Sequence, residues 1–313
     1  MSEGGPKNER DSAVSRIVGL TEEQEASAHT EAADIFEDQS SKTVKIGERI
    51  FNVEDLERKK TPEEKELIAI ILSKMPEFVA GYGGRAVKLS EDHIHFLDIN
   101  KLDDEIRERI PKFGEAIPGY EPPKFGAPSE EIEPDIYSED QQFVSLFSSG
   151  GDLQTVLSMV HEIIHFNSFH SYEKDDSEEG GTVRSRRFGL STISYKKPGY
   201  KTIYFDDMNE AITTELAIRF VKKYFDESLQ LSEQSLNSAV EYSYPKARDI
   251  LDASIEDLSQ DNPLSKEDVF SIFARAAMSG NLIELYRLAK KTYGAEVFSR
   301  IREANKKEIK IKK

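Results

Sequence analysis

The sequence of 313 residues contains no cysteine and no tryptophan. Without cysteine, the chain has no disulfide, thiolate zinc site, iron–sulfur cluster or cysteine nucleophile. Its longest aliphatic run, from Leu67 to Leu72, is far shorter than the roughly 20 residues of a membrane-spanning helix. Residues 1–7 lack the basic start and apolar stretch of a secretory signal. These absences predict a cytoplasmic protein with no membrane span, and leave open export by a route that needs no signal peptide.

Positive charge is also scarce. The 42 Lys and Arg residues face 59 Asp and Glu residues, which gives a net charge of −17. Proteins that bind nucleic acid usually carry a basic face that neutralises phosphate. Nucleic acid is therefore not an expected partner. Hydrophobic residues make up 37% of the chain, which is enough for a globular core at this length.

Three stretches are expected along the chain. Residues 1–44 are rich in Ser, Glu, Ala and Gly and carry few large apolar residues, which predicts a disordered acidic arm. Residues 45–138 form an N-terminal α+β region that ends in an irregular loop or linker, because proline and glycine are frequent over 111–137. Residues 139–313 form a second region with a helical C-terminal subdomain.

The pattern of apolar residues predicts an α+β fold, with a small mixed sheet and a mostly helical C-terminal half. A helix should begin at Thr61 and end before Pro76, and a hairpin should cover 86–97. Residues 171–186 read as polar, with a flexible loop over 175–181, and 306–313 as a solvated, frayed end. The remaining predicted elements are strands at 142–148, 188–195 and 200–205, and helices at 152–167, 207–225, 232–259, 265–279 and 281–304.

The strongest motif is His161-Glu162-Ile163-Ile164-His165, an HExxH sequence on an apolar helix. Residues four apart on a helix share one face, so both imidazoles can bind one metal ion. Imidazole and oxygen ligands favour zinc, which acidifies its bound water. Glu162 can accept the proton of that water and pass it to a leaving amine. The competing interpretation is a chance motif whose histidines are hydrogen-bonded core residues.

A catalytic zinc site needs a third protein ligand. His170 comes five residues after His165 and points away from the ligand face, and no histidine follows it. The longer pattern HExxHxxGxxH is rejected because positions 168 and 171 are serine. The third ligand is then a carboxylate, unless a histidine upstream of the motif returns to the site. The best carboxylate is Glu210, near the start of the next amphipathic helix.

With Glu210 in the stretch Met208-Asn209-Glu210-Ala211-Ile212-Thr213, residues 142–225 resemble the gluzincins, the thermolysin-like zinc metallopeptidases. The resemblance implies a zincin-like fold, with His161, His165 and Glu210 as zinc ligands and Glu162 as general base. It also implies that the strand at 142–148 pairs with an extended peptide substrate. More loosely, the segment from Phe273 to Gly294 is similar to the helical tail of uncharacterised bacterial zincin-like proteins.

The sequence departs from the gluzincin pattern in its supporting residues. That family often has an acidic residue four positions after the ligand glutamate to orient the first histidine, but this position is Thr214. Glu215 comes one residue too late and points elsewhere on a regular helix. The hydroxyl of Thr214, or the carboxylate of Asp206 or Asp207, can substitute.

A donor that stabilises the oxyanion is also needed, and with no late histidine a tyrosine is the natural choice. Tyr204 and Tyr244 are the candidates, and the alternative for each is an ordinary half-buried tyrosine. Elsewhere, His93 and His95 would share one face of a strand. They form either a second metal site or, more simply, the polar face of the predicted hairpin.

The sequence thus predicts a zinc metallopeptidase, a hydrolase that acts on a peptide or protein substrate. Three alternatives remain. The first is a zinc-binding interaction module that no longer cuts peptides. The second is a protease effector or toxin, for which the acidic arm would be a secretion segment. The third is a helical interaction protein in which the motif is accidental.

Overall fold

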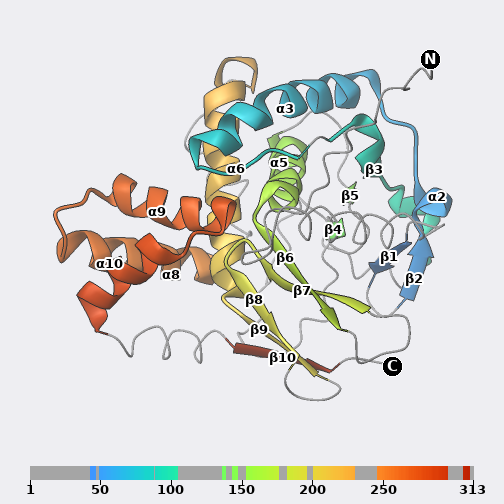
Figure 1. Cartoon of the computed structure of the whole chain (residues 1–313). Coiled ribbons are helices and arrows are strands. Elements are labelled where there is room, and N and C mark those ends of the chain that lie inside the picture. Colours follow the sequence, from blue (N-terminus) through green and yellow to red (C-terminus); the bar gives the residue numbers. More distant parts are fainter. Residues whose placement is uncertain are drawn as a thin grey trace, which may run out of the picture.

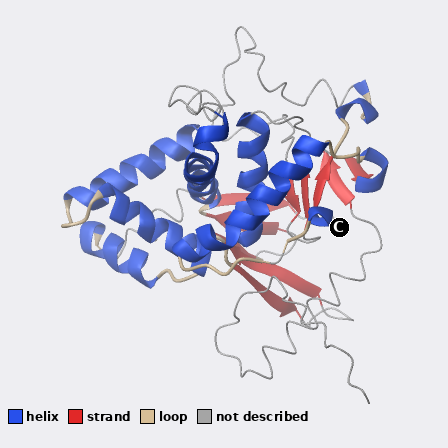
Figure 2. Cartoon of the chain, turned by 90° about the horizontal axis from the view of Figure 1, so that it is seen from above, coloured by secondary structure: helices blue, strands red, loops and turns tan. Residues whose placement is uncertain are grey.

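The structure is a computed structural model and describes residues 43–46, 49–87, 89–104, 136–138, 143–146, 153–175, 182–195, 200–229, 245–294 and 306–310. These residues form a mixed α+β fold with more helix than strand, in agreement with the predicted class. Figure 2 shows the long helices gathered at one side and most strands at the other. Within the described part of the chain, no helix has both the length and the apolar composition needed to cross a bilayer.

The described chain opens with a small unit that has its own apolar core. β1 (Thr43–Ile46) and β2 (Arg49–Asn52) pair antiparallel, and the short helix α2 (Val53–Leu56) follows. The buried residues of this core are Val44, Ile46, Val53, Leu56, Leu97 and Leu102. β1 thus begins inside the stretch 1–44 that was expected to be an arm. The division of the chain at residue 138 stays a prediction.

The helix α3 (Pro62–Gly81) begins where the sequence predicts but runs past its expected end. Thr61 caps it, because the Thr61 hydroxyl accepts a hydrogen bond from the Glu64 backbone N–H at 3.2 Å. The expected end before Pro76 is wrong. A proline inside a helix removes one backbone hydrogen bond, but burial in the main core outweighs that loss over the last turns, at Met75, Phe78 and Val79.

The strand predicted at 142–148 is present as β5 (Phe143–Leu146), and it is the central strand of a three-stranded sheet. β3 (Ile94–Phe96) pairs with it in parallel, and β4 (Ile136–Ser138) pairs antiparallel on the other side. Both edges of β5 are therefore occupied by the chain itself. The expectation that a peptide substrate adds to this strand is wrong for β5.

The hairpin expected at 86–97 is also wrong. Among the described residues of this stretch, a 3₁₀ turn, η1 (Glu91–His93), leads directly into β3, which is the single strand found there. All three residues of β3 are buried, so the strand has no solvated face. Its partner β5 lies far along the chain, and local alternation carries no information about such a pairing.

Two long helices, α5 (Leu153–Asn167) and α6 (Asp206–Leu229), pack against each other at the centre of the main core. Three further helices, α8 (Pro245–Gln260), α9 (Lys266–Ser279) and α10 (Ile283–Tyr293), lie on the side of α6 away from the N-terminal unit (Figure 1). Helices were predicted in all five places. Residues 230–244 and 295–305, which belong to two of the predictions, lie outside the described residues.

A second sheet has the strand order β10–β9–β8–β7–β6 and is antiparallel throughout. The predicted strands at 188–195 and 200–205 correspond to β8 (Ser191–Ser194) and β9 (Tyr200–Tyr204). The sequence analysis missed β6 (His170–Asp175), β7 (Thr182–Phe188) and β10 (Lys306–Lys310). β10 pairs with β9, so the expected frayed end is wrong there. Charged residues suit such an edge strand because they oppose further strand pairing.

Candidate metal centre

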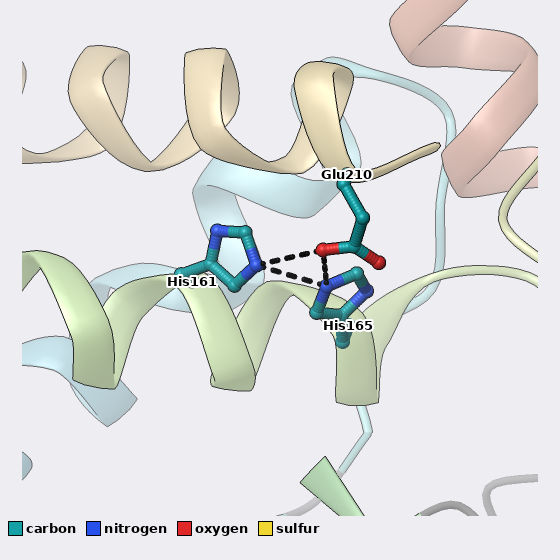
Figure 3. Close-up of side chains that lie close together, drawn as sticks. All are labelled: His161, His165 and Glu210. Carbon is teal, nitrogen blue, oxygen red and sulfur yellow. Dashed lines mark hydrogen bonds and ion pairs between the residues drawn. The ribbon is translucent and has the colours of Figure 1, made fainter. Parts of the chain in front are cut away.

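The helix α5 positions the two histidines of the motif. It is apolar around most of its circumference, and its buried residues hold it in the main core. Because one turn separates His161 from His165, both rings leave α5 on the same side. Figure 3 shows them projecting toward the first turns of α6, from which Glu210 reaches down between them.

The three predicted ligands converge on one point. His161 Nε2 lies 3.2 Å from Glu210 Oε2, His165 Nε2 lies 3.1 Å from the same oxygen, and the two Nε2 atoms are 3.0 Å apart. The side chains of His161, His165 and Glu210 are 15%, 7% and 16% exposed, so the site is largely shielded from water. Within the described ranges this is the one group of three side chains arranged to hold a metal ion.

The spacing of these donor atoms fits a metal ion. Zinc binds nitrogen and carboxylate oxygen at about 2.0–2.2 Å, and two ligands of a tetrahedral ion then stand about 3.4 Å apart. The triangle formed by the two Nε2 atoms and Oε2 has edges of 3.0, 3.1 and 3.2 Å, close to that value. A carboxylate and two imidazoles are also the donor set that zinc accepts at catalytic sites. These three side chains could therefore supply three of the four ligands of a tetrahedral metal ion.

The buried charges of the site shift one another's pKa values. Burial alone would raise the pKa of Glu210, but the charge of His165 and the hydrogen bonds from both histidines hold it well below its usual range. Burial acts to lower the pKa of His165, yet the charge and hydrogen bond of Glu210 raise it to about 9. For His161 burial is decisive and lowers the pKa. Glu210 is therefore anionic and attracts a cation.

Glu162, the predicted general base, lies at the same site. It is 8% exposed and follows His161 directly on α5. After burial and Glu210, its charge is the next influence on the pKa of His165, so the carboxylate stands close to the ligand group. It is not one of the three converging side chains.

Thr214, one of the residues proposed to orient the first histidine, reaches it. Its hydroxyl lies 3.4 Å from His161 Nδ1. Glu215 points elsewhere, as expected, and accepts a hydrogen bond from Arg219 Nε at 2.8 Å. This contact agrees with the prediction that the Thr214 hydroxyl can orient the first ring.

The other histidines that the structure describes do not join the site. His170 begins β6, and its buried Nε2 donates to the backbone carbonyl of His165 at 3.2 Å. Burial lowers the pKa of His170 to about 4, so the ring is neutral. His95 Nδ1 lies 2.8 Å from Glu57, and His93 Nδ1 lies 2.9 Å from the Ser90 hydroxyl. Both readings of the His93–His95 pair are therefore wrong: the hairpin is not formed, and the two rings contact different partners.

The two candidate oxyanion donors stay predictions. Tyr204 is half-buried at the end of β9, where it pairs with Thr192 and Lys306 and precedes α6 by one residue, Phe205. Tyr244 lies outside the described residues.

The sequence analysis gave no role to Asn209, which anchors the first turn of α6. Asn209 is fully buried, and its Oδ1 accepts a hydrogen bond from the Leu190 backbone N–H at 2.8 Å in the turn between β7 and β8. Gly189 in the same turn has a φ of +52°, and a Cβ there would stand 2.0 Å from Asn209 Oδ1. The only local signal was the glycine between two apolar stretches, so the contact could not be found from the sequence.

A Gly189→Ala substitution is expected to lower the free energy of unfolding by roughly 2–4 kcal/mol, because it combines a strained φ with a clash in a packed site. Urea denaturation followed by circular dichroism measures this. Gly81→Ala is the matched control, since a Cβ at Gly81 has no atom within 4 Å and its φ is not positive. Equal urea midpoints for the two variants would contradict the close contact between Gly189 and Asn209.

Comparison with known proteins identifies no relative of this chain. No protein-family model and no curated protein matches the sequence, and no solved structure matches the fold. The function of the chain is therefore inferred from its own residues.

Proposed function

We propose that the chain is a zinc-dependent peptidase of the gluzincin type. The observation that carries the proposal is the convergence of His161, His165 and Glu210 from two helices, with donor atoms 3.0–3.2 Å apart. The ligand order along the chain supports it, since the HExxH helix comes before the glutamate helix. A zincin-like arrangement is part of the same proposal, supported by the α5–α6 pair packed beside a small mixed sheet.

In this proposal, His161, His165 and Glu210 would hold zinc, which when bound would acidify a water molecule and polarise the substrate carbonyl. Glu162 accepts a proton from the attacking water and returns it to the leaving amine. Both histidines would bind the metal through a deprotonated Nε2, and Thr214 helps to hold the first ring in position. Water attacks the carbonyl directly, so the chain needs no side-chain nucleophile and forms no acyl-enzyme.

A zinc-binding module that does not cut peptides is the second candidate, and the position of β5 favours it. In the expected peptidase, the strand before the zinc helix pairs with the substrate backbone. Here β3 and β4 occupy both edges of that strand. If the chain is a peptidase, its substrate must pair at another edge or bind through side chains alone.

The proposal is tested first on the purified full-length protein. Elemental analysis should find about one zinc per chain, as expected for a single three-ligand site. The zinc-loaded protein should cut members of a peptide library, with products identified by mass spectrometry, and a chelator should abolish the cutting. A zinc-loaded protein that cuts nothing supports the second candidate. If the protein takes up no zinc, even after incubation with zinc salt, both candidates are discarded.

A further inference from the structure

One atom of the candidate metal centre lacks a hydrogen-bond partner. His165 Nδ1 is buried, and no acceptor contacts it among the described residues. Nε2 of the same ring faces Glu210 and His161. When Nε2 binds a metal, the proton of the neutral ring lies on Nδ1. Histidines that bind metals nearly always donate this second N–H to a carboxylate, carbonyl or water. An acceptor for Nδ1 is therefore expected near the far side of the ring.

The packing of α5 against α6 indicates where this acceptor comes from. The helices run antiparallel, because Thr214 contacts His161, while Glu210, earlier on α6, contacts His165, later on α5. Glu210, one turn before Thr214, contacts both histidines (Figure 3). One turn before Glu210 on the same face of α6 stands Asp206, the first residue of the helix. Continuing the register places Asp206 beyond Glu210, toward His165.

Asp206 is held in place at the start of α6. Its Oδ1 accepts a hydrogen bond from the Ser191 hydroxyl at 3.3 Å, which ties the start of α6 to β8. From this position the register of α6 brings the Asp206 carboxylate to the side of Glu210 on which His165 lies.

We propose that Asp206 is a positioning residue whose carboxylate accepts the Nδ1–H of His165 in the metal-loaded protein. This inference rests on the proposed zinc site. Asp206 keeps the ring in the tautomer that presents Nε2 to the metal, while Thr214 does the same for His161 from the other side of Glu210. Three positions of α6, each four residues apart, then serve one site: the first and third orient the histidines and the second binds the metal.

The test compares zinc affinity among matched variants of the full-length protein, measured by competition with a chromogenic chelator. Asp206→Ala is expected to weaken zinc binding about 10–100-fold, the usual loss when such a supporting group is removed. Asp207→Ala is the control, because it removes the same charge from the same helix end in a different direction. Its effect should stay within about twofold, because Asp207 does not share the face of α6 that carries Asp206, Glu210 and Thr214. Asp206→Asn keeps an oxygen acceptor and should recover part of the affinity.

A spectroscopic signature separates positioning from a general loss of structure. In zinc-loaded protein labelled with ¹⁵N-histidine, the Nδ1 proton of His165 should appear as a slowly exchanging, downfield resonance. It should move or vanish in Asp206→Ala and persist in Asp207→Ala. Equal zinc affinities for wild type and Asp206→Ala, or equal losses in both Ala variants, would overturn the inference while leaving the zinc site intact. A wild type without zinc would instead refute the proposed function and the inference together.

Discussion

A Glu162→Gln variant is expected to lose roughly 10²–10⁴-fold in peptide cleavage, the usual contribution of a general acid–base group, and to keep its zinc. Glutamine has nearly the same shape but cannot accept the proton of the attacking water. Glu162 is outside the group of three converging ligands, so the substitution leaves the metal donors in place. The measurements are kcat on a peptide selected from the library and zinc content by elemental analysis.

The matched control is Glu215→Gln, which changes a carboxylate of α6 that bonds Arg219 instead of the metal ligands. It should leave both kcat and zinc content unchanged. Cleavage by Glu162→Gln at the wild-type rate would remove Glu162 from the mechanism. Loss of zinc from this variant would instead assign it a structural role. Glu162→Gln also reveals any contaminating protease, because the activity of a contaminant would survive this substitution.

The local parts of the site were accessible from the sequence. The spacing of His161 and His165 fixes their common face on any regular helix, and the end of α5 was predicted from the same periodicity. Glu210 was found because ligand chemistry demands a third donor and the late part of the chain holds no histidine. Thr61 marked the start of α3 through capping, which involves only the next few residues.

Features that depend on contacts between distant parts of the chain could not be predicted from the sequence. The central place of β5 depends on β3 and β4, and the pairing of β10 with β9 joins segments about a hundred residues apart in the sequence. The helix α3 continues through Pro76 because of what its last turns pack against, which no local rule contains. The contact between Asn209 and the turn at Gly189 likewise exists only after the sheet and α6 have met.

Glu210→Ala is expected to weaken zinc binding by more than the 10–100-fold that follows loss of a supporting group, because a direct ligand is removed. Two imidazoles then remain as ligands, and the site has lost the Glu210 carboxylate, whose negative charge attracts a cation. Glu210 Oε2 lies within 3.2 Å of both Nε2 atoms. Elemental analysis after dialysis against a weak chelator, together with competition titration, measures the loss.

Two further variants separate the effect of the negative charge of Glu210 from the effect of its side-chain length. Glu210→Gln keeps an oxygen in place without the charge, and Glu210→Asp keeps the charge on a side chain shorter by one methylene. Both should bind zinc more weakly than wild type, because this site uses an anion that spans the gap from α6 to α5. Glu215→Ala, five residues further along α6, should bind like wild type. Wild-type affinity in Glu210→Ala would mean that a histidine upstream of the motif, or another carboxylate, completes the site.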